Sequence, residues 1–375
     1  QLRIGILFFF LTKSDVFKNP TIAKILYALN MLPIYRERDG SDFMEKNKAI
    51  FNRCSEILEG NGRIIIFPEG SHNSKNRLRQ LKKGIARIAI QADKNTQEDI
   101  WIVPVGLNYT NTKNKCADLF LSYGKAINAS ELFRENINAT IENELTNPLM
   151  EKISDGLRNE MLDYKDDNFY ELSEFLISKI KRQRTSLKSR YIWDKIKSEK
   201  LNAFISSHGN EAKEMQKQTI ELEEVCIQNK LKPYLFNKRS HNLFLPIIGL
   251  IFGFPLFVYG AINSYFPSII PQQFILKNIQ DRQYDTSINM VLGGFLMFFF
   301  WAVQSFLVSL FTGHYIWIWY FISCVISRWF SFEYHIFYLR FIGKKNYNKF
   351  VKANRELANS LRNNYDSLKQ FIFNL

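Results

Sequence analysis

The sequence predicts an α/β protein, with a mostly parallel sheet in residues 1–128 followed by two α-helical regions. Short apolar runs alternate with amphipathic stretches over this first range, as expected for strands joined by helices. Residues 129–240 are rich in charged residues, Asn and Gln, with apolar side chains at helical spacing, which indicates a charged helical region. Residues 241–375 hold long uncharged runs and a basic C-terminal tail, which indicates a helical membrane module.

The expected strands are short, nearly continuous apolar runs, which are typical of strands buried on both faces of a sheet. A helix is expected to begin at Asn19-Pro20, because proline favours the first helical position. A second is expected over Phe43–Leu58, which Gly60 would end, and a third over Leu78–Ala92. The strands are expected at Ile4–Leu11, Leu32–Arg36, Arg63–Phe67, Trp101–Val105 and Asp118–Tyr123.

The last third of the chain contains hydrophobic segments long enough to cross a membrane. Leu243–Phe266 has no charged residue, and Thr286–Ser327 has no formal charge. A single crossing takes about 20 residues, so the second run fits two helices with a turn at Thr312-Gly313-His314. Cations flank the module on both sides, which places both flanks in the cytoplasm. We expect an integral membrane protein with two crossings, with either the first or the last segment re-entrant or interfacial.

Composition and charge restrict the class of partner. The chain has 375 residues and a net charge of +14, which favours anionic partners. Its four cysteines lie far apart and indicate free thiols in a reducing compartment, with no metal site. Nucleic acid is not an expected partner, because the chain has no recognisable binding module and its aromatic residues lie in membrane-like runs.

The sharpest local signal is Phe67-Pro68-Glu69-Gly70-Ser71, which interrupts an apolar run. Proline and glycine end the strand and leave the Glu69 carboxylate at its carboxyl edge, where open α/β sheets bind ligands. A site for a phosphate ester is the interpretation we favour, although such cations often form only a solvated helix face. The cations that follow are Lys75, Arg77, Arg79, Lys82, Lys83 and Arg87.

These residues resemble the glycerophospholipid acyltransferase family, of the lysophosphatidate acyltransferase type. Leu32-Pro33-Ile34-Tyr35-Arg36 is similar to its second block, an apolar run ending in arginine. Phe67–Ser71 is similar to its third block, Phe-Pro-Glu-Gly, with Leu81–Ala86 as the usual extension. Val103-Pro104-Val105 is similar to its fourth block, an apolar run around proline. The resemblance covers about residues 1–128 and implies an acyltransferase domain.

The resemblance implies substrate-binding roles at the two strand ends. Arg36 is the best candidate to bind phosphate, since a guanidinium forms paired hydrogen bonds with it; the alternative is an exposed arginine at a strand end. Glu69 would bind the glycerol-phosphate substrate or hold the cations of the site; the alternative is a loop carboxylate that pairs with Lys82 or Lys83. The substrate-binding set is Arg36, Glu69, Gly70, Ser71, Lys82 and Lys83. Ser71-His72 stands where the family often has Thr-Arg, so Arg77, Arg79 or Lys82 would supply that charge.

The family's general base is the histidine of a His-x4-Asp block, which would precede Ile4–Leu11 and hence Gln1. The acceptor alcohol needs such a base as it attacks the thioester carbonyl. The start at Gln1 favours a chain truncated before this block over an inactive protein. His72 is the alternative base, but an ordinary loop histidine is the interpretation we favour for it, because no carboxylate lies four residues away.

The implied function is transfer of a fatty acyl chain to a lysophospholipid, such as 1-acyl-glycerol-3-phosphate, at the cytoplasmic membrane face. The donor would be acyl-CoA or acyl-carrier protein, and the reaction needs no cofactor or metal. Glycerol 3-phosphate remains open as the acceptor. The alternative is a catalytically silent membrane relative that binds lysolipid or serves as a scaffold. The charged region 129–240 has no assigned chemistry.

Overall fold

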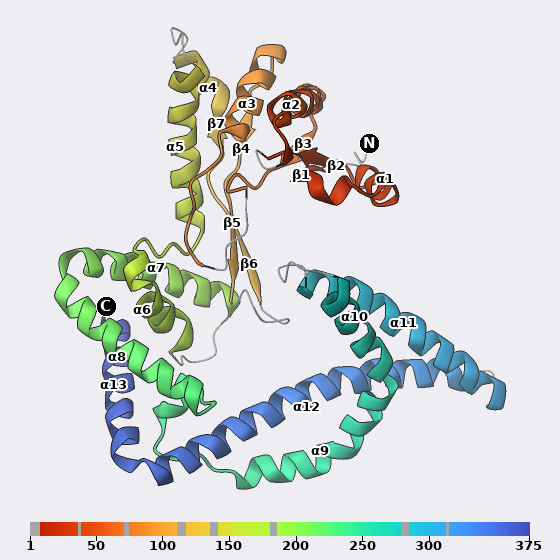
Figure 1. Cartoon of the computed structure of the whole chain (residues 1–375), viewed down its shortest axis with the longest axis vertical. Helices are drawn as coiled ribbons and strands as arrows, with labels where there is room; N and C mark the ends of the chain where they lie inside the picture. Colours follow the sequence, from red (N-terminus) through yellow and green to blue (C-terminus); the bar gives the residue numbers. More distant parts are fainter. Residues whose placement is uncertain are drawn as a thin grey trace. The chain divides into compact units, whose positions relative to one another are not determined.

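The computed structural model describes residues 8–36, 39–70, 75–110, 118–135, 142–180, 186–278, 285–312 and 315–375. The chain forms two compact units. The first comprises Gln1–Tyr170 with Arg184–Ser207, and the second comprises Glu171–Gln183 with His208–Leu375 (Figure 1). The first unit contains the strands, and the second contains the apolar helices.

A parallel sheet of three strands begins the first unit. Its strands are β1 (Phe8–Lys13), β2 (Met31–Ile34) and β3 (Arg63–Ile65), in the order β2-β1-β3. Phe10 of β1 lies opposite both Met31 of β2 and Ile65 of β3. Because β2 and β3 both run parallel to β1, the carboxyl ends of all three strands meet at one edge. This arrangement confirms the predicted fold class.

Helices connect the parallel strands, and local sequence signals fix their ends. The 3-10 turn η1 (Ser14–Phe17) and helix α1 (Pro20–Ala28) lie between β1 and β2. The Asn19 carboxamide accepts the Thr21 N–H at 3.0 Å, which satisfies one of the free N–H groups of the first turn. Helix α2 (Phe43–Glu59) connects β2 to β3 and ends at Gly60. Both helices match the sequence-based expectation.

Two expected features of the third strand and third helix differ from the structure. Strand β3 is an edge strand that ends at Ile65, so it is half-buried rather than covered on both faces, and Phe67 is 60% exposed. Helix α3 covers Gly84–Asn95 instead of beginning at Leu78. Tertiary hydrogen bonds hold the intervening residues: the Leu78 N–H donates to Asp163, and the Lys82 N–H donates to the Pro68 carbonyl.

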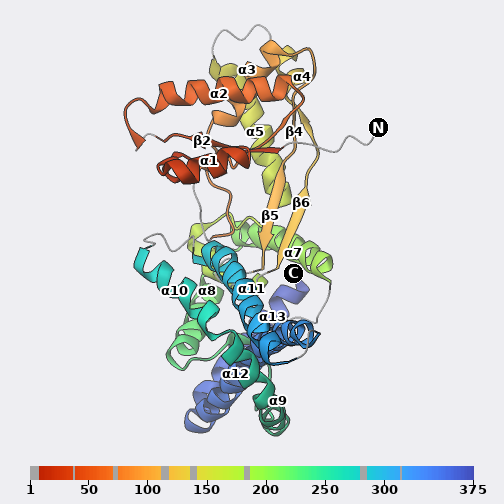
Figure 2. The same ribbon diagram turned by 90° about the vertical axis from the view of Figure 1, so that its right-hand side faces the viewer.

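The later strands pair antiparallel instead of extending the parallel sheet. Strand β4 (Trp101–Ile102) pairs with β7 (Ile127–Asn128), and β5 (Val105–Tyr109) pairs with β6 (Leu119–Tyr123) (Figure 2). Pro104 stands between β4 and β5 and cannot donate to a ladder, which explains the break in the predicted strand Trp101–Val105.

The core of the first unit lies between helices. Helix α4 (Ala129–Glu135) and helix α5 (Glu142–Glu160) pack with α3. Gly106 of β5 faces the Glu160 carbonyl at the end of α5, and a side chain there would collide with that backbone. The unit is completed by η3 (Asp167–Phe169) and α7 (Leu187–Ser207). The central cluster consists of Ala86, Ala89, Ala92, Ile100, Ala129, Leu132, Phe133, Leu149 and Ile153.

The second unit is helical, as expected for most of its length. Its shorter elements are α6 (Tyr170–Glu174), which begins at the last residue of the first unit, the π-helix η4 (Phe175–Lys179), and η5 (Pro233–Asn237). Helices α8 (Gly209–Gln228) and α13 (Arg355–Asn374) pack together with η5. The buried side chains of these elements and of η4 include Leu176, Leu222, Phe236, Leu361 and Tyr365.

Four apolar or partly apolar helices follow η5 along the chain. Among the residues that the structure describes, two segments are long and apolar enough to cross a membrane, Phe244–Asn263 and Ile288–Phe311. The expected turn after the second segment falls between Phe311 and Ile316, although Gly313 and His314 lie outside the described residues. The helices are α9 (Phe244–Asn263), α10 (Tyr265–Asn278), α11 (Asp285–Phe311) and α12 (Ile316–Ala353).

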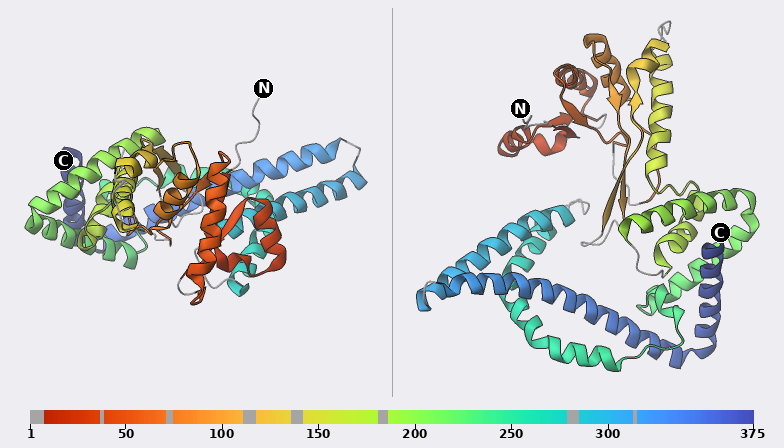
Figure 3. Two further views of the ribbon diagram at one scale, coloured as in Figure 1. Left: turned by 90° about the horizontal axis from the view of Figure 1, so that it is seen from above. Right: turned by 180° about the vertical axis from the view of Figure 1, so that it is seen from behind.

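Helices α9 and α12 pack side by side through small residues (Figure 3). A side chain at Gly260 of α9 would collide with the Ser327 carbonyl and the Ser331 hydroxyl of α12. Glycine therefore lets the two backbones approach closely, as small residues do between helices in membranes. The Tyr334 hydroxyl also donates to the Leu250 carbonyl at 2.8 Å.

Candidate functional site

The structure brings together the ends of two strands, β2 and β3, that helix α2 separates in the sequence. Arg36 follows β2, and Glu69-Gly70 follows β3, both at the carboxyl edge of the parallel sheet. A guanidinium N–H of Arg36 donates to the Gly70 carbonyl. Two residues of the predicted substrate-binding set, Arg36 and Gly70, are thus in direct contact, although β1 lies between their strands.

The Phe67–Gly70 segment is a tight turn that presents its polar groups at this edge. The Gly70 N–H donates to the Phe67 carbonyl at 3.1 Å, and proline at the second position presets the φ angle for such a turn. Gly70 has φ +67°, a left-handed conformation that glycine adopts without a steric penalty. The turn is therefore encoded by its Pro-Glu-Gly sequence.

Lys82 packs over this turn from the segment before α3. Its N–H donates to the Pro68 carbonyl at 2.7 Å. Its Cγ atom lies 3.3 Å from the position that a Cβ atom on Gly70 would occupy. The structure therefore gathers Lys82 with Arg36 around Gly70. These two cations come from different segments, and each lies at the peptide groups of the same turn.

Arg36 is held in place by a side chain that the sequence did not identify. The Tyr35 N–H donates to the Asn47 carboxamide at 2.9 Å, and the Asn47 amide donates to the Tyr35 carbonyl at 2.7 Å. Asn47 lies on α2 and is only 8% exposed. The Arg36 N–H donates to Asp39 at 2.8 Å, and the Ser14 hydroxyl donates to the same carboxylate oxygen at 2.8 Å.

Glu69 is half-buried and bonds to the backbone rather than to a lysine. Its carboxylate accepts the Arg79 N–H at 3.2 Å. Within the described segments no ion pair joins it to Lys82 or Lys83, so the alternative pairing that the sequence suggested is not formed. Lys83 donates instead to the Asn143 carboxamide of α5 at 2.7 Å. Lys83 thus links α5 to the segment before α3.

Two of the other cations have a structural partner. Lys75 and Arg77 both pair with Asp167, and the hydrogen bond from Arg77 lowers the pKa of this carboxyl below its usual value. The Lys75 ammonium also lies 4.9 Å from the centre of the Tyr170 ring. The basic segment is therefore held against residues 163–170 of the same unit. Arg77 is not a free charge for a phosphate.

Two predicted site residues fall outside the structure's description. Ser71 and His72 belong to residues 71–74, so their predicted roles remain predictions. Within the described ranges, no group of three His, Cys, Asp or Glu side chains lies close enough to hold a metal ion.

The remaining geometry suits an anionic ligand. Arg36 uses one guanidinium N–H on Gly70, and its other guanidinium N–H groups have no partner in the described part of the chain. Such N–H groups match the oxygens of a phosphate, which a planar guanidinium holds through paired hydrogen bonds. The side-chain ammonium of Lys82 is likewise unpaired among these residues and exposed. Both charges are therefore available beside one turn.

Comparison with known proteins finds similarity in the part of the chain that contains Arg36 and the Phe67–Gly70 turn. Residues 6–108 match the model of the family described as Acyltransferase. Over 113 residues, the chain is 30% identical to glycerol-3-phosphate O-acyltransferase 1 of Saccharomyces cerevisiae. This similarity covers 30% of the present chain and 15% of the yeast protein. No solved structure matches the chain. The match to the family includes Arg36, the Glu69-Gly70 turn, Lys82 and Lys83.

Proposed function

We propose that the chain is an O-acyltransferase whose acceptor carries a phosphate, with lysophosphatidate as the preferred acceptor. The observation that carries the proposal is the contact of Arg36 with Gly70, in the region that matches the Acyltransferase family. The name of the yeast relative supports glycerol 3-phosphate as the second acceptor to test. Both acceptors present a phosphate and a free hydroxyl.

In the proposed reaction, the acceptor hydroxyl attacks the thioester carbonyl of acyl-CoA or acyl-carrier protein. An ester C–O bond forms, the thioester C–S bond breaks, and the free thiol leaves. A general base takes the hydroxyl proton, and the departing sulfur receives a proton. Arg36 and Lys82 would bind the phosphate, which holds the hydroxyl near the donor. The resemblance assigns the base to a histidine of a His-x4-Asp block, with His72 as the alternative.

The apolar helices support a location at a membrane. Two of them are suited to crossing it by length and composition, and a membrane-bound enzyme would meet its lipid acceptor directly. We propose that the acyltransferase domain acts at the cytoplasmic face, because cations such as Lys238 and Lys344 flank the apolar segments.

An acyl-transfer assay tests the proposal. The protein in phospholipid nanodiscs would receive labelled acyl-CoA or acyl-carrier protein together with lysophosphatidate or glycerol 3-phosphate. We expect phosphatidate to form, and we expect Arg36→Ala to lower kcat/KM roughly 10- to 100-fold, because a hydrogen bond to a charged group contributes about 1.5–3 kcal/mol. The matched control is Arg53→Ala, since Arg53 is exposed on α2 and pairs with Glu56 at 2.7 Å.

Two outcomes would count against the proposal. If no acceptor is acylated but lysophosphatidate still binds, the chain is a silent relative that binds lysolipid. If product forms and Arg53→Ala lowers kcat/KM as much as Arg36→Ala does, then the assigned role of Arg36 is wrong.

A further inference from the structure

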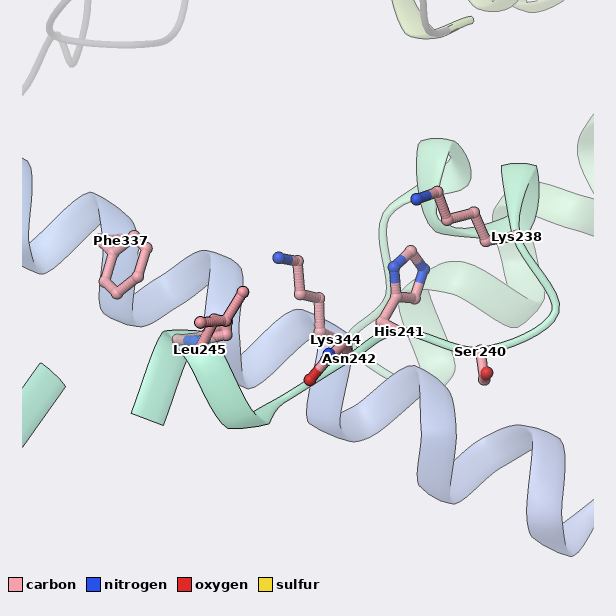
Figure 4. A pocket seen from close by; sticks show the side chains of 8 residues that line it. Lys238, Ser240, His241, Asn242, Leu245, Phe337 and Lys344 are labelled. Carbon is pink, nitrogen blue, oxygen red and sulfur yellow. The ribbon is translucent and has the colours of Figure 1, made fainter. Parts of the chain in front are cut away.

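The helical unit contains an open pocket of about 650 Å³ where α9 begins beside α12 (Figure 4). Lys238, His241 and Lys344 line one part of it, and Leu245 and Phe337 line another. In Figure 4 the two ammonium groups and the imidazole ring project to the same side of the loop. Leu245 and Phe337 lie together at the opposite end of the labelled pocket residues. The pocket therefore has a cationic end and an apolar end.

The two lysines of the cationic end have no acidic partner among the described residues. Lys238 and Lys344 make no ion pair with any described residue. The chain around them strengthens the field, because α12 carries a single acidic residue, Glu333, and residues 233–263 carry none. An anion would therefore be attracted to this pocket.

The loop that carries Lys238 and His241 is fixed to α12 by hydrogen bonds. The His241 N–H donates to the Asn348 carboxamide at 2.9 Å, and the Asn348 amide donates to the His241 carbonyl at 2.7 Å. The Tyr347 hydroxyl donates to the Lys238 carbonyl at 2.8 Å. These bonds within the chain place Lys238 and His241 beside Lys344. A preformed site loses less conformational entropy when it binds.

The apolar end continues into surface suited to lipid chains. Helix α9 has no charged residue, and its first turns leave Phe244 69%, Leu245 70% and Phe252 82% exposed. The transition from cations to apolar side chains thus occurs at the first residue of α9. In a membrane protein such a transition lies at the headgroup level, where cations meet lipid phosphates. A free phosphate ion would make no use of the apolar end.

We propose that this pocket binds the phosphate of an anionic membrane phospholipid, with the lipid's acyl chains along Leu245 and Phe337. Lys238 and Lys344 would contact the phosphate oxygens. This lipid site is additional to the acyltransferase site, because every residue that lines it belongs to the helical unit. The proposal does not depend on acyl transfer.

Equilibrium binding of fluorescent phosphatidylglycerol to the detergent-solubilised full chain tests this site. This lipid is neither acceptor nor product of the proposed reaction. We expect tighter binding than of phosphatidylcholine with the same chains. Lys238→Gln with Lys344→Gln should weaken the binding roughly 30-fold, at about 1 kcal/mol per cation. Arg36→Ala should leave it unchanged, which separates this site from the acyltransferase site.

The matched control is Lys345→Gln with Lys349→Gln, which removes the same charge from exposed positions of α12 that do not line the pocket. We expect this control to bind phosphatidylglycerol as the unaltered chain does. Equal weakening in both double variants would overturn the proposal, since diffuse charge would then explain the binding. Equal affinity for phosphatidylcholine would also overturn it. Competition by inorganic phosphate at the concentration at which the lipid binds would show a free-anion site and exclude the lipid.

Discussion

Replacing Asn47 by Ala should release the end of β2 from α2, because it removes both hydrogen bonds to the Tyr35 peptide. Two net hydrogen bonds of about 1 kcal/mol each are lost, so the opening free energy of this segment falls by about 2 kcal/mol. Amide exchange at Tyr35 should then rise roughly 30-fold, since 1.4 kcal/mol corresponds to about a factor of ten. Hydrogen exchange of the full chain, followed by mass spectrometry of peptides covering Met31–Ile34 and Tyr35, measures this change.

The matched control is Asn52→Ala on the same helix. Asn52 is exposed and accepts one hydrogen bond from Gln91. Both substitutions gain the same helix propensity, about 0.6 kcal/mol, so the difference between them isolates the contact with Tyr35. Unchanged exchange at Tyr35 in Asn47→Ala, or an equal rise in Asn52→Ala, would refute the view that Asn47 fixes the strand end that carries Arg36.

Three further predictions concern single residues. Gly70→Ala should destabilise the turn by about 1–2 kcal/mol, because Gly70 has φ +67°; faster hydrogen exchange of the amide at position 70, which donates to the Phe67 carbonyl, measures it. Gly260→Ala should lower the midpoint of thermal unfolding in detergent, since the new methyl group collides with Ser327; Gly294→Ala, with nothing within 4 Å of its Cβ, should not. Cys54 should resist alkylation at pH 8 until the chain unfolds, because burial raises its pKa to about 12. Peptide mapping would compare its labelling in the native and the denatured chain, and equal labelling would contradict this prediction.

The sequence was sufficient to predict the elements whose signals are local. The apolar runs of β1 to β3, the Asn19 cap of α1 and the end of α2 at Gly60 all follow from neighbouring residues. The arginine after one strand and the Pro-Glu-Gly turn after another were each predicted at a strand end, and in the structure Arg36 contacts Gly70.

The features that sequence analysis missed depend on tertiary contacts. Helix α3 begins later than its apolar spacing suggests, because Leu78 bonds to Asp163, far along the chain. The strand at Asp118–Tyr123 was expected, but its antiparallel pairing with β5 was not, because an apolar pattern does not identify which strands pair. Asn47 lies on an ordinary helix and reaches the strand end only in the folded chain. A buried asparagine within an amphipathic helix was the available signal, and it is a weak one.

Binding of lysophosphatidate tests most directly whether the edge beside Gly70 recognises a phosphate-bearing acceptor. The affinity of the full chain for lysophosphatidate would be compared with its affinity for the monoacylglycerol of the same chain length, which lacks the phosphate. We expect the intact chain to prefer lysophosphatidate, Arg36→Ala to lose that preference roughly 10- to 100-fold, and Arg53→Ala to keep it. Retention of the full preference in Arg36→Ala would contradict the proposed role of this edge of the sheet.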